Sequence, residues 1–113
     1  MSKIKKPKTK RHKFHAIPTT IDGIRFASKA EARRYEELKL MQKSKEIKKL
    51  ELQPSYQIEV NGQKICKYIA DFRYQDSKGN EHIEDVKGIL TPVFRLKQKL
   101  LRACHGLEIE IVK

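Results

Sequence analysis

Apolar residues recur at helical spacing in two segments of the chain, which predicts two amphipathic helices. The first helix should cover residues 29–45, because Ser28 and Glu31 form the Ser-x-x-Glu pattern of a capping box at its start. The second should cover residues 92–105, between a Thr-Pro pair suited to a helix start and Gly106, which is placed to end it. The predicted apolar stripes are Ala32, Tyr35, Leu38 and Met41 in the first helix, and Val93, Leu96, Leu100 and Cys104 in the second.

Alternating apolar and polar residues predict strands in the rest of the chain. The predicted strands cover residues 50–60, 64–75, 81–87 and 107–111. Asn61-Gly62 is a strong hairpin signal between the first two, and Asp22-Gly23 predicts a tight turn near the start of the chain. The resulting order is α-β-β-β-α-β. Three strands should form an antiparallel meander, and the last returns through a helix and should run parallel to a neighbour. The predicted fold class is α/β, with a mixed central sheet flanked by helices.

The net charge of the chain limits the classes of partner that it is expected to bind. Lys and Arg number 26 against 14 Asp and Glu, so the net charge is +12, which favours nucleic acid or an anionic membrane. No apolar run approaches the roughly 20 residues of a membrane span, and the helices lack the broad Trp- or Phe-bearing apolar face of a membrane-surface helix. Nucleic acid is therefore the expected partner, with no membrane. Cys66 and Cys104 form no metal-type pair, and we expect reduced cysteines in a cytoplasmic protein.

The basic residues are concentrated at the N-terminus. Residues 1–20 contain no acidic residue and show no hydrophobic period, so we expect a flexible arm, followed by one folded domain over residues 21–113. Such an arm could contact phosphates, with an affinity that falls with salt, or it could serve as a solubilising tail. The DNA-binding candidates are Lys5, Lys6, Lys8, Lys10, Arg11, Lys13 and, on the second predicted helix, Lys97.

Two aspartates and a lysine can meet on neighbouring strands. With a five-residue loop between the second and third predicted strands, Gln75 faces Glu81 and Asp71 faces Asp85, on the same sheet face as Lys87. Opposed carboxylates repel each other, and a hard divalent cation removes that repulsion, because Mg²⁺ takes one or two carboxylates together with water and phosphate oxygens. A loop one residue shorter would send Asp71 to the other face.

Three further residues have an ordinary explanation beside a functional one. Glu31 could supply a third oxygen ligand from the first helical turn, but capping-box chemistry alone explains it equally well. Gln53 precedes a proline and could lie in a second shell around the site, although a surface position is the commoner one. Lys87 taken alone would be an ordinary exposed lysine, and its position beside two aspartates is what favours a role in chemistry.

Three short motifs carry a resemblance to a known family. They are Tyr-Ile-Ala-Asp-Phe at residues 68–72, Glu-Asp-Val-Lys-Gly at residues 84–88, and Ser-Lys-Ala-Glu-Ala at residues 28–32. Together with the element order, they resemble the PD-(D/E)XK nuclease superfamily. Residues 14–112 look like a family of small, mostly phage-encoded proteins of that superfamily, related to phage junction-resolving endonucleases and the TnsA transposase subunit. Ala70 stands where proline is usual, and Asp85 stands where Glu is commoner; both variants fit the superfamily pattern.

The resemblance implies a restriction-endonuclease-like fold and a DNA endonuclease that depends on Mg²⁺ or Mn²⁺. It implies branched or structured DNA as the substrate, as for Holliday-junction resolvases, a homodimer, no small-molecule cofactor, and the bacterial host cytoplasm if the protein is phage-encoded. Asp71 would bind the metal ion, Asp85 and the Val86 carbonyl would complete its coordination, and Glu31 would hold a second ion or a metal-bound water. Lys87 would orient the attacking water. The alternative is a non-catalytic basic DNA- or RNA-binding protein on a degenerate nuclease fold.

Overall fold

The computed structural model describes residues 17–113, and the chain divides into two units, residues 1–37 and 38–113. The first unit contains a short hairpin of β1 (Thr19–Ile21) and β2 (Ile24–Phe26). The turn residues Asp22 and Gly23 have φ values of 54° and 76°, as a type I′ turn requires, so the predicted turn is confirmed. Strand β1 thus begins within the stretch assigned to the arm, and the six basic candidates at residues 5–13 lie outside the described residues.

Helix α1 (Lys29–Lys43) begins where the capping pattern predicts, because the backbone N–H of Glu31 donates to Ser28 Oγ at 3.1 Å. Within the first unit, the Tyr35 hydroxyl donates to Asp22 Oδ2 at 3.0 Å, and the Tyr35 ring lies 4.9 Å from that of Phe26. Of the predicted stripe, Ala32, Tyr35 and Leu38 are buried and Met41 is half-buried. The helix ends two residues earlier than predicted, just before Lys45 takes a positive φ.

The second unit is built on a mixed sheet of four strands in the order β3-β6-β7-β8. These strands are β3 (Ile47–Leu52), β6 (Phe72–Asp76), β7 (Glu81–Val86) and β8 (Ile109–Val112). β3 and β7 run antiparallel to β6, whereas β8 runs parallel to β7. The parallel last strand confirms the prediction of a helical crossover, since parallel neighbours cannot be joined by a tight turn. The α/β class with a mixed sheet is also confirmed.

The predicted meander of three continuous strands is wrong in one respect. Each of its first two strands is broken, and the outer halves, β4 (Ser55–Val60) and β5 (Gln63–Ile69), form a separate two-stranded sheet. Pro54 has no N–H for a sheet ladder, and the preceding Gln53 has a φ of 51°. The two breaks lie side by side, because the Ala70 N–H donates to the Pro54 carbonyl at 3.0 Å. The result is a bent hairpin, and Asp71 lies at the bend.

Helix α2 (Pro92–His105) follows the predicted local signals. The Thr91 side chain accepts from the Phe94 N–H at the start, and Gly106 ends the helix in the left-handed region with φ 68°. The predicted apolar stripe is wrong, because Val93 is 63% exposed and Leu96 is 58% exposed. The buried stripe is shifted by about one residue, or roughly 100° around the helix. No described helix is long and apolar enough to cross a membrane.

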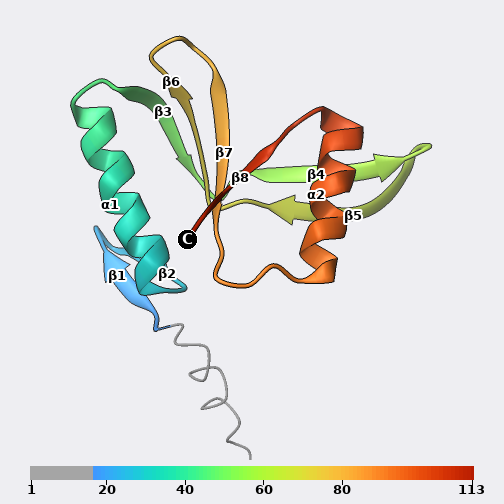
Figure 1. Cartoon of the computed structure of the whole chain (residues 1–113), viewed down its shortest axis with the longest axis horizontal. Helices are drawn as coiled ribbons and strands as arrows, with labels where there is room; N and C mark the ends of the chain where they lie inside the picture. Colours follow the sequence, from blue (N-terminus) through green and yellow to red (C-terminus); the bar gives the residue numbers. More distant parts are fainter. Residues whose placement is uncertain (1–16) are drawn as a thin grey trace, which may run out of the picture. The chain divides into compact units, whose positions relative to one another are not determined.

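The core of the second unit lies between α2, the β4–β5 hairpin and the four-stranded sheet. Figure 1 shows α2 beside that hairpin. The cluster comprises Ile58, Tyr68, Ala70, Ile83, Phe94, Leu101 and Ile109. Because these residues come from two strands of the sheet, both strands of the hairpin and α2, burying them fixes the first turn of α2 close to the bend that carries Asp71.

Candidate functional site

The two predicted aspartates lie at the open end of the β6–β7 hairpin. Gln75 faces Glu81 across the two strands, so the predicted register is confirmed. Continued outward, this register brings Asp71 opposite Asp85, where β6 begins and β7 nears its end. Asp85 is buried and Asp71 is half-buried, so Asp71 is the more accessible of the two carboxylates.

Each carboxylate is bound by the backbone of the other strand. The Asp71 backbone N–H donates to Asp85 Oδ1 at 3.1 Å, and it lies at the same distance from the Glu84 carbonyl. In return, the Val86 N–H donates to Asp71 Oδ2 at 2.8 Å. The Asp71 carbonyl accepts from the Gln53 N–H at 3.0 Å, across the bend. The backbone of Gln53 therefore supports Asp71, while its side chain is exposed.

One carboxylate oxygen of the site is left without a partner. Asp85 Oδ2 is buried and has no hydrogen-bond partner. Burial raises the pKa of Asp85 to about 6, against the opposing effects of the Lys87 charge and the hydrogen bond from Asp71. Burial also raises the pKa of Asp71, against the Val86 hydrogen bond and Lys87. Desolvation dominates in both groups, as expected for buried charge without a full set of partners.

Lys87 is held beside this pair by β8 and α2. Its backbone N–H donates to the Val112 carbonyl at 2.9 Å, and its Nζ lies 4.8 Å from the centre of the Phe94 ring. An ammonium over a ring face is attracted to it by about 0.5–1 kcal/mol. Lys87 and the predicted DNA contact Lys97 also line one cavity of about 330 Å³. The structure thus brings Asp71, Asp85 and Lys87 together and adds Lys97 nearby.

Glu31 and the backbone of Val86 are the other two predicted metal ligands. Glu31 is buried in the first turn of α1, in the first unit, and its metal role stays a prediction. The Val86 backbone lies beside Asp71 through the hydrogen bond described above. Among residues 17–113, no group of three or more His, Cys, Asp or Glu side chains is arranged to hold a metal ion. The side chains of the site alone therefore offer a two-carboxylate set.

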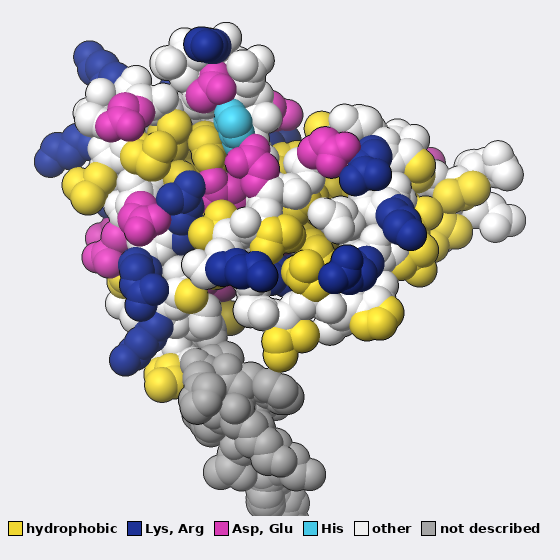
Figure 2. Space-filling model, viewed as in Figure 1, with side chains coloured by type: hydrophobic (Ala, Val, Ile, Leu, Met, Phe, Trp, Pro, Cys, Tyr) yellow, Lys and Arg dark blue, Asp and Glu magenta, His cyan; other side chains and the backbone are white. Residues whose placement is uncertain are grey.

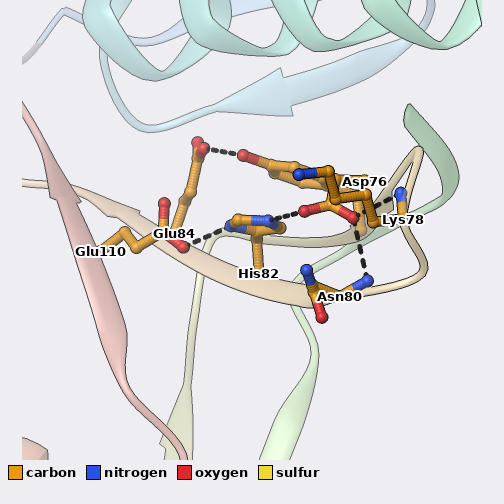
Figure 3. A network of polar contacts seen from close by, with 7 residues as sticks. Asp76, Lys78, Asn80, His82, Glu84 and Glu110 are labelled. Atoms are coloured by element: carbon orange, nitrogen blue, oxygen red, sulfur yellow. Dashed lines mark hydrogen bonds and ion pairs between the residues drawn. The ribbon is translucent and has the colours of Figure 1, made fainter. Parts of the chain in front are cut away.

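A second polar cluster, which the sequence analysis missed, lies nearer the β6–β7 turn (Figure 3). We call Tyr74, Asp76, His82, Glu84 and Glu110 the histidine cluster. The His82 ring bonds Asp76 Oδ2 through Nε2 at 2.9 Å and Glu110 Oε2 through Nδ1 at 2.5 Å. It stacks on the Tyr74 ring at 5.2 Å, and the Tyr74 hydroxyl donates to the Glu84 carboxylate. Glu84 is buried in this cluster.

Hydrogen bonds are the main cause of the pKa shifts of Asp76 and His82. The bond with His82 is the main reason why the pKa of Asp76 falls to about 2, and N–H groups of Asn80 and Lys78 add to it. The bond with Asp76 is the main reason why the pKa of His82 rises; burial opposes that rise, and the bond with Glu110 adds to it. The contact between His82 and Glu110 joins residues 28 positions apart, so local sequence patterns do not show it. The alternating pattern of residues 107–111 was the available signal, since a parallel β8 places Glu110 beside Glu84.

Residues 11–110 match a family described as a protein of unknown function, DUF1064. The chain belongs to this family. The DUF1064 match spans both ends of the β6–β7 hairpin, and it therefore includes Asp71, Asp85, Lys87 and the whole histidine cluster. No curated protein and no solved structure matches the chain.

Proposed function

We propose that this protein is a divalent-metal-dependent DNA endonuclease with a restriction-endonuclease-like core. The observation that carries the proposal is Asp85, a buried carboxylate with one oxygen that has no partner, placed opposite Asp71. A buried charge without partners costs free energy in the folded protein. A cation bound between the two carboxylates would remove that cost, and a protein that only binds DNA has no need of this arrangement.

The donor set suits a hard divalent cation. Asp71, Asp85 and the Val86 carbonyl would hold the ion, and Glu31 remains a predicted further ligand. Mg²⁺ accepts one or two carboxylates and keeps water and phosphate oxygens in its other positions, and Mn²⁺ prefers similar oxygen ligands. When bound, such an ion would lower the pKa of water, so that the stronger nucleophile hydroxide forms near neutral pH, and it would offset the charge of the phosphate.

Lys87 has a separate role in the proposed reaction. An ammonium group donates hydrogen bonds and accepts none, so it suits the attacking water oxygen or a non-bridging phosphate oxygen. The Phe94 ring and the β8 backbone restrict where the side chain can lie. A charge held in advance near the reacting phosphate stabilises the negative charge that develops in the transition state.

The surface of the second unit supports DNA as the partner. Figure 2 shows Lys and Arg side chains, interleaved with hydrophobic ones, over the region where Figure 1 places α2. The net charge of +12 favours a polyanion over a neutral or acidic ligand. A preference for branched or structured DNA and a homodimeric state belong to the proposal through the superfamily resemblance.

A cleavage panel tests the proposal. Linear, nicked, flapped and four-way DNA are incubated with the protein in Mg²⁺, Mn²⁺ or EDTA. We expect cutting with either metal ion and none in EDTA. Asp71→Asn should lose cutting and keep DNA binding. Lys87→Ala should lose cutting, and the exposed turn variant Lys78→Ala serves as its matched control. If no substrate is cut in any metal, a non-catalytic nucleic-acid-binding protein becomes the better description.

Metal binding is measured independently of cutting. Thermal unfolding of the wild-type chain is followed with and without Mg²⁺ or Mn²⁺. A ligand at 100 times its Kd stabilises the folded state by about 2.7 kcal/mol, so the melting temperature should rise. Asp71→Asn should abolish the rise, and Glu31→Gln tests the predicted additional ligand. A rise that is equal in wild type and Asp71→Asn would place the ion elsewhere.

A further inference from the structure

A cavity of about 330 Å³ lies between β5 and the first turns of α2, next to the proposed active site. Its polar lining consists of Lys67, Tyr68, Lys87, Thr91 and Lys97. All of these residues belong to the second unit, and the core cluster between β5 and α2 holds the walls together. Lys87 is common to the cavity and to the proposed active site.

The charged side chains that line the cavity are all positive. Three lysines line it, and no acidic residue does. None of Lys67, Lys87 and Lys97 forms an ion pair within residues 17–113. Three ammonium groups around one hollow repel each other, and the hollow focuses their field on whatever enters it. An anion is therefore the ligand that this lining favours.

The buried Tyr68 hydroxyl is a second, independent observation that points to a ligand. Tyr68 is only 4% exposed, and its hydroxyl is buried without a hydrogen-bond partner. Its ring lies 6.2 Å from that of Phe94, against the start of α2. Tyr68 lines the cavity, and its hydroxyl is a donor that the fold leaves unused.

Helix α2 adds the polarity of its N-terminus. Thr91, Val93 and Phe94, which belong to its cap and first turn, all line the cavity. The N-terminal end of a helix carries partial positive charge, which favours phosphate groups. In α2, Pro92 has no N–H and the Phe94 N–H donates to Thr91, so the Val93 N–H is the first-turn donor left for a ligand. The Thr91 oxygen accepts from the Phe94 N–H at 3.1 Å, and its hydroxyl hydrogen stays available to an incoming acceptor.

We propose that this cavity binds a DNA backbone phosphate adjacent to the one that is cut, and so fixes the strand in the active site. The proposal deepens the proposed function and rests on it for the position of the cut. A phosphate supplies several acceptor oxygens and a negative charge, which match the lysines, the Tyr68 hydroxyl and the helix N-terminus. Lys87 links the two sites, because it lines the cavity and its charge acts on both Asp71 and Asp85.

The first test uses matched lysine variants of the full chain. Lys67→Ala and Lys97→Ala are compared with Lys64→Ala on the same strand and Lys99→Ala on the same helix, neither of which lines the cavity. Binding of a fluorescent DNA duplex is measured in EDTA over a range of salt concentrations. Each cavity variant should weaken binding several-fold more than its control and reduce the slope of log K against log salt by about 0.9. Equal effects in cavity and control variants would overturn the proposal.

The second test removes the Tyr68 hydroxyl. Tyr68→Phe should fold with unchanged or higher stability, because the hydroxyl has no partner in the free protein. Amide chemical shifts of Val93 and Phe94 are followed during titration with inorganic phosphate, with chloride at equal ionic strength as control. Phosphate should shift these amides in wild type and bind several-fold more weakly to Tyr68→Phe. No shift at these amides, or a destabilised Tyr68→Phe, would overturn the proposal.

The outcomes separate this proposal from the proposed function. If the cavity variants bind DNA more weakly but no substrate is cut, the cavity is supported as a phosphate site and the endonuclease proposal is contradicted. If DNA is cut but the cavity variants bind DNA as their controls do, the phosphate site is contradicted and the endonuclease proposal is retained.

Discussion

The two ends of the β6–β7 hairpin hold acidic residues in opposite states. At the turn, Asp76 bonds His82 and two backbone N–H groups, and its pKa falls to about 2. At the open end, Asp85 has a buried oxygen without a partner, and its pKa rises to about 6. Both acids lie on the same pair of strands, so their surroundings set the difference. Asp85 is buried, and desolvation raises its pKa, whereas Asp76 is partly exposed, and its hydrogen bonds lower its pKa.

This contrast separates a structural group from a functional candidate. Asp76 and His82 satisfy each other and join the hairpin to β8, so the histidine cluster is complete as it stands (Figure 3). The Asp71–Asp85 pair is incomplete, and incomplete polar groups concentrate where a ligand binds. Four predictions test whether the two ends differ in this way, in order of decreasing effect.

The largest expected effect is the difference in DNA cleavage rate between Asp71→Asn and Asp76→Asn. Loss of a proposed metal ligand should lower the single-turnover cleavage rate by at least about 100-fold, since even changes around metal ligands cost 10–100-fold. Asp76→Asn should cut near the wild-type rate, because Asp76 lies at the other end of the hairpin. Equal losses in the two variants would show that general destabilisation, not the site, controls activity.

The second-largest expected effect is a pH-dependent difference in the free energy of unfolding between Asp85→Asn and wild type, measured in EDTA. The folded state raises the pKa of Asp85 from 3.8 to about 6, so it favours the protonated acid. Wild type should therefore lose stability as pH rises from about 4 to above about 6, by at most about 3 kcal/mol. Asparagine carries no charge at either pH. Asp85→Asn should match wild type near pH 4 and exceed it near pH 7 in urea unfolding; a less stable variant near pH 7 would contradict the incomplete pair.

Two buried tyrosines allow the same comparison for hydroxyl groups. Tyr74→Phe removes a donor to the buried Glu84 carboxylate and should cost about 1–3 kcal/mol of unfolding free energy. Tyr68→Phe removes a hydroxyl that has no partner and should cost nothing. Chemical denaturation of both variants at one pH measures the difference. Similar costs for both would mean that the two hydroxyls are equally well bound.

The smallest effect is expected for His82→Asn. The folded state raises the pKa of His82 above its ordinary 6.5, so charged His82 contributes stability that is complete below pH 6.5. That contribution is lost as pH rises through the raised pKa. Because His82 is partly exposed, the effect should stay below about 1 kcal/mol. The difference in melting temperature between wild type and His82→Asn should shrink from about pH 6 to about pH 9; a constant difference would exclude a charged histidine.

Short-range features of the fold were predictable from the sequence. The Thr91 cap, the Gly106 helix end and the Asn61-Gly62 turn all depend on residues within four positions of each other, so composition at those positions is decisive. The β6–β7 register was predictable for the same reason, because a short loop sets which residues pair.

Features that depend on distant contacts were predicted wrongly or not at all. The bend at Pro54 and Asp71 forms where two breaks meet across a hairpin, and single-strand patterns do not show it. The apolar stripe of α2 was misplaced because Val93 and Phe94 are both apolar, and packing against Tyr68 and Ile83 decides which of them is buried.

The sequence by itself determined a basic chain, two capped helices and tight turns, and it gave the register that places Asp71 opposite Asp85 as one that depends on the length of a loop. Tertiary structure alone decided which acids are satisfied, because partners such as Glu110 for His82 come from distant segments. It also decided that Asp85 Oδ2 and the Tyr68 hydroxyl are buried without partners. Burial and hydrogen bonding depend on every element that packs around a group, and they set both the pKa of a carboxyl and the place where a ligand is needed.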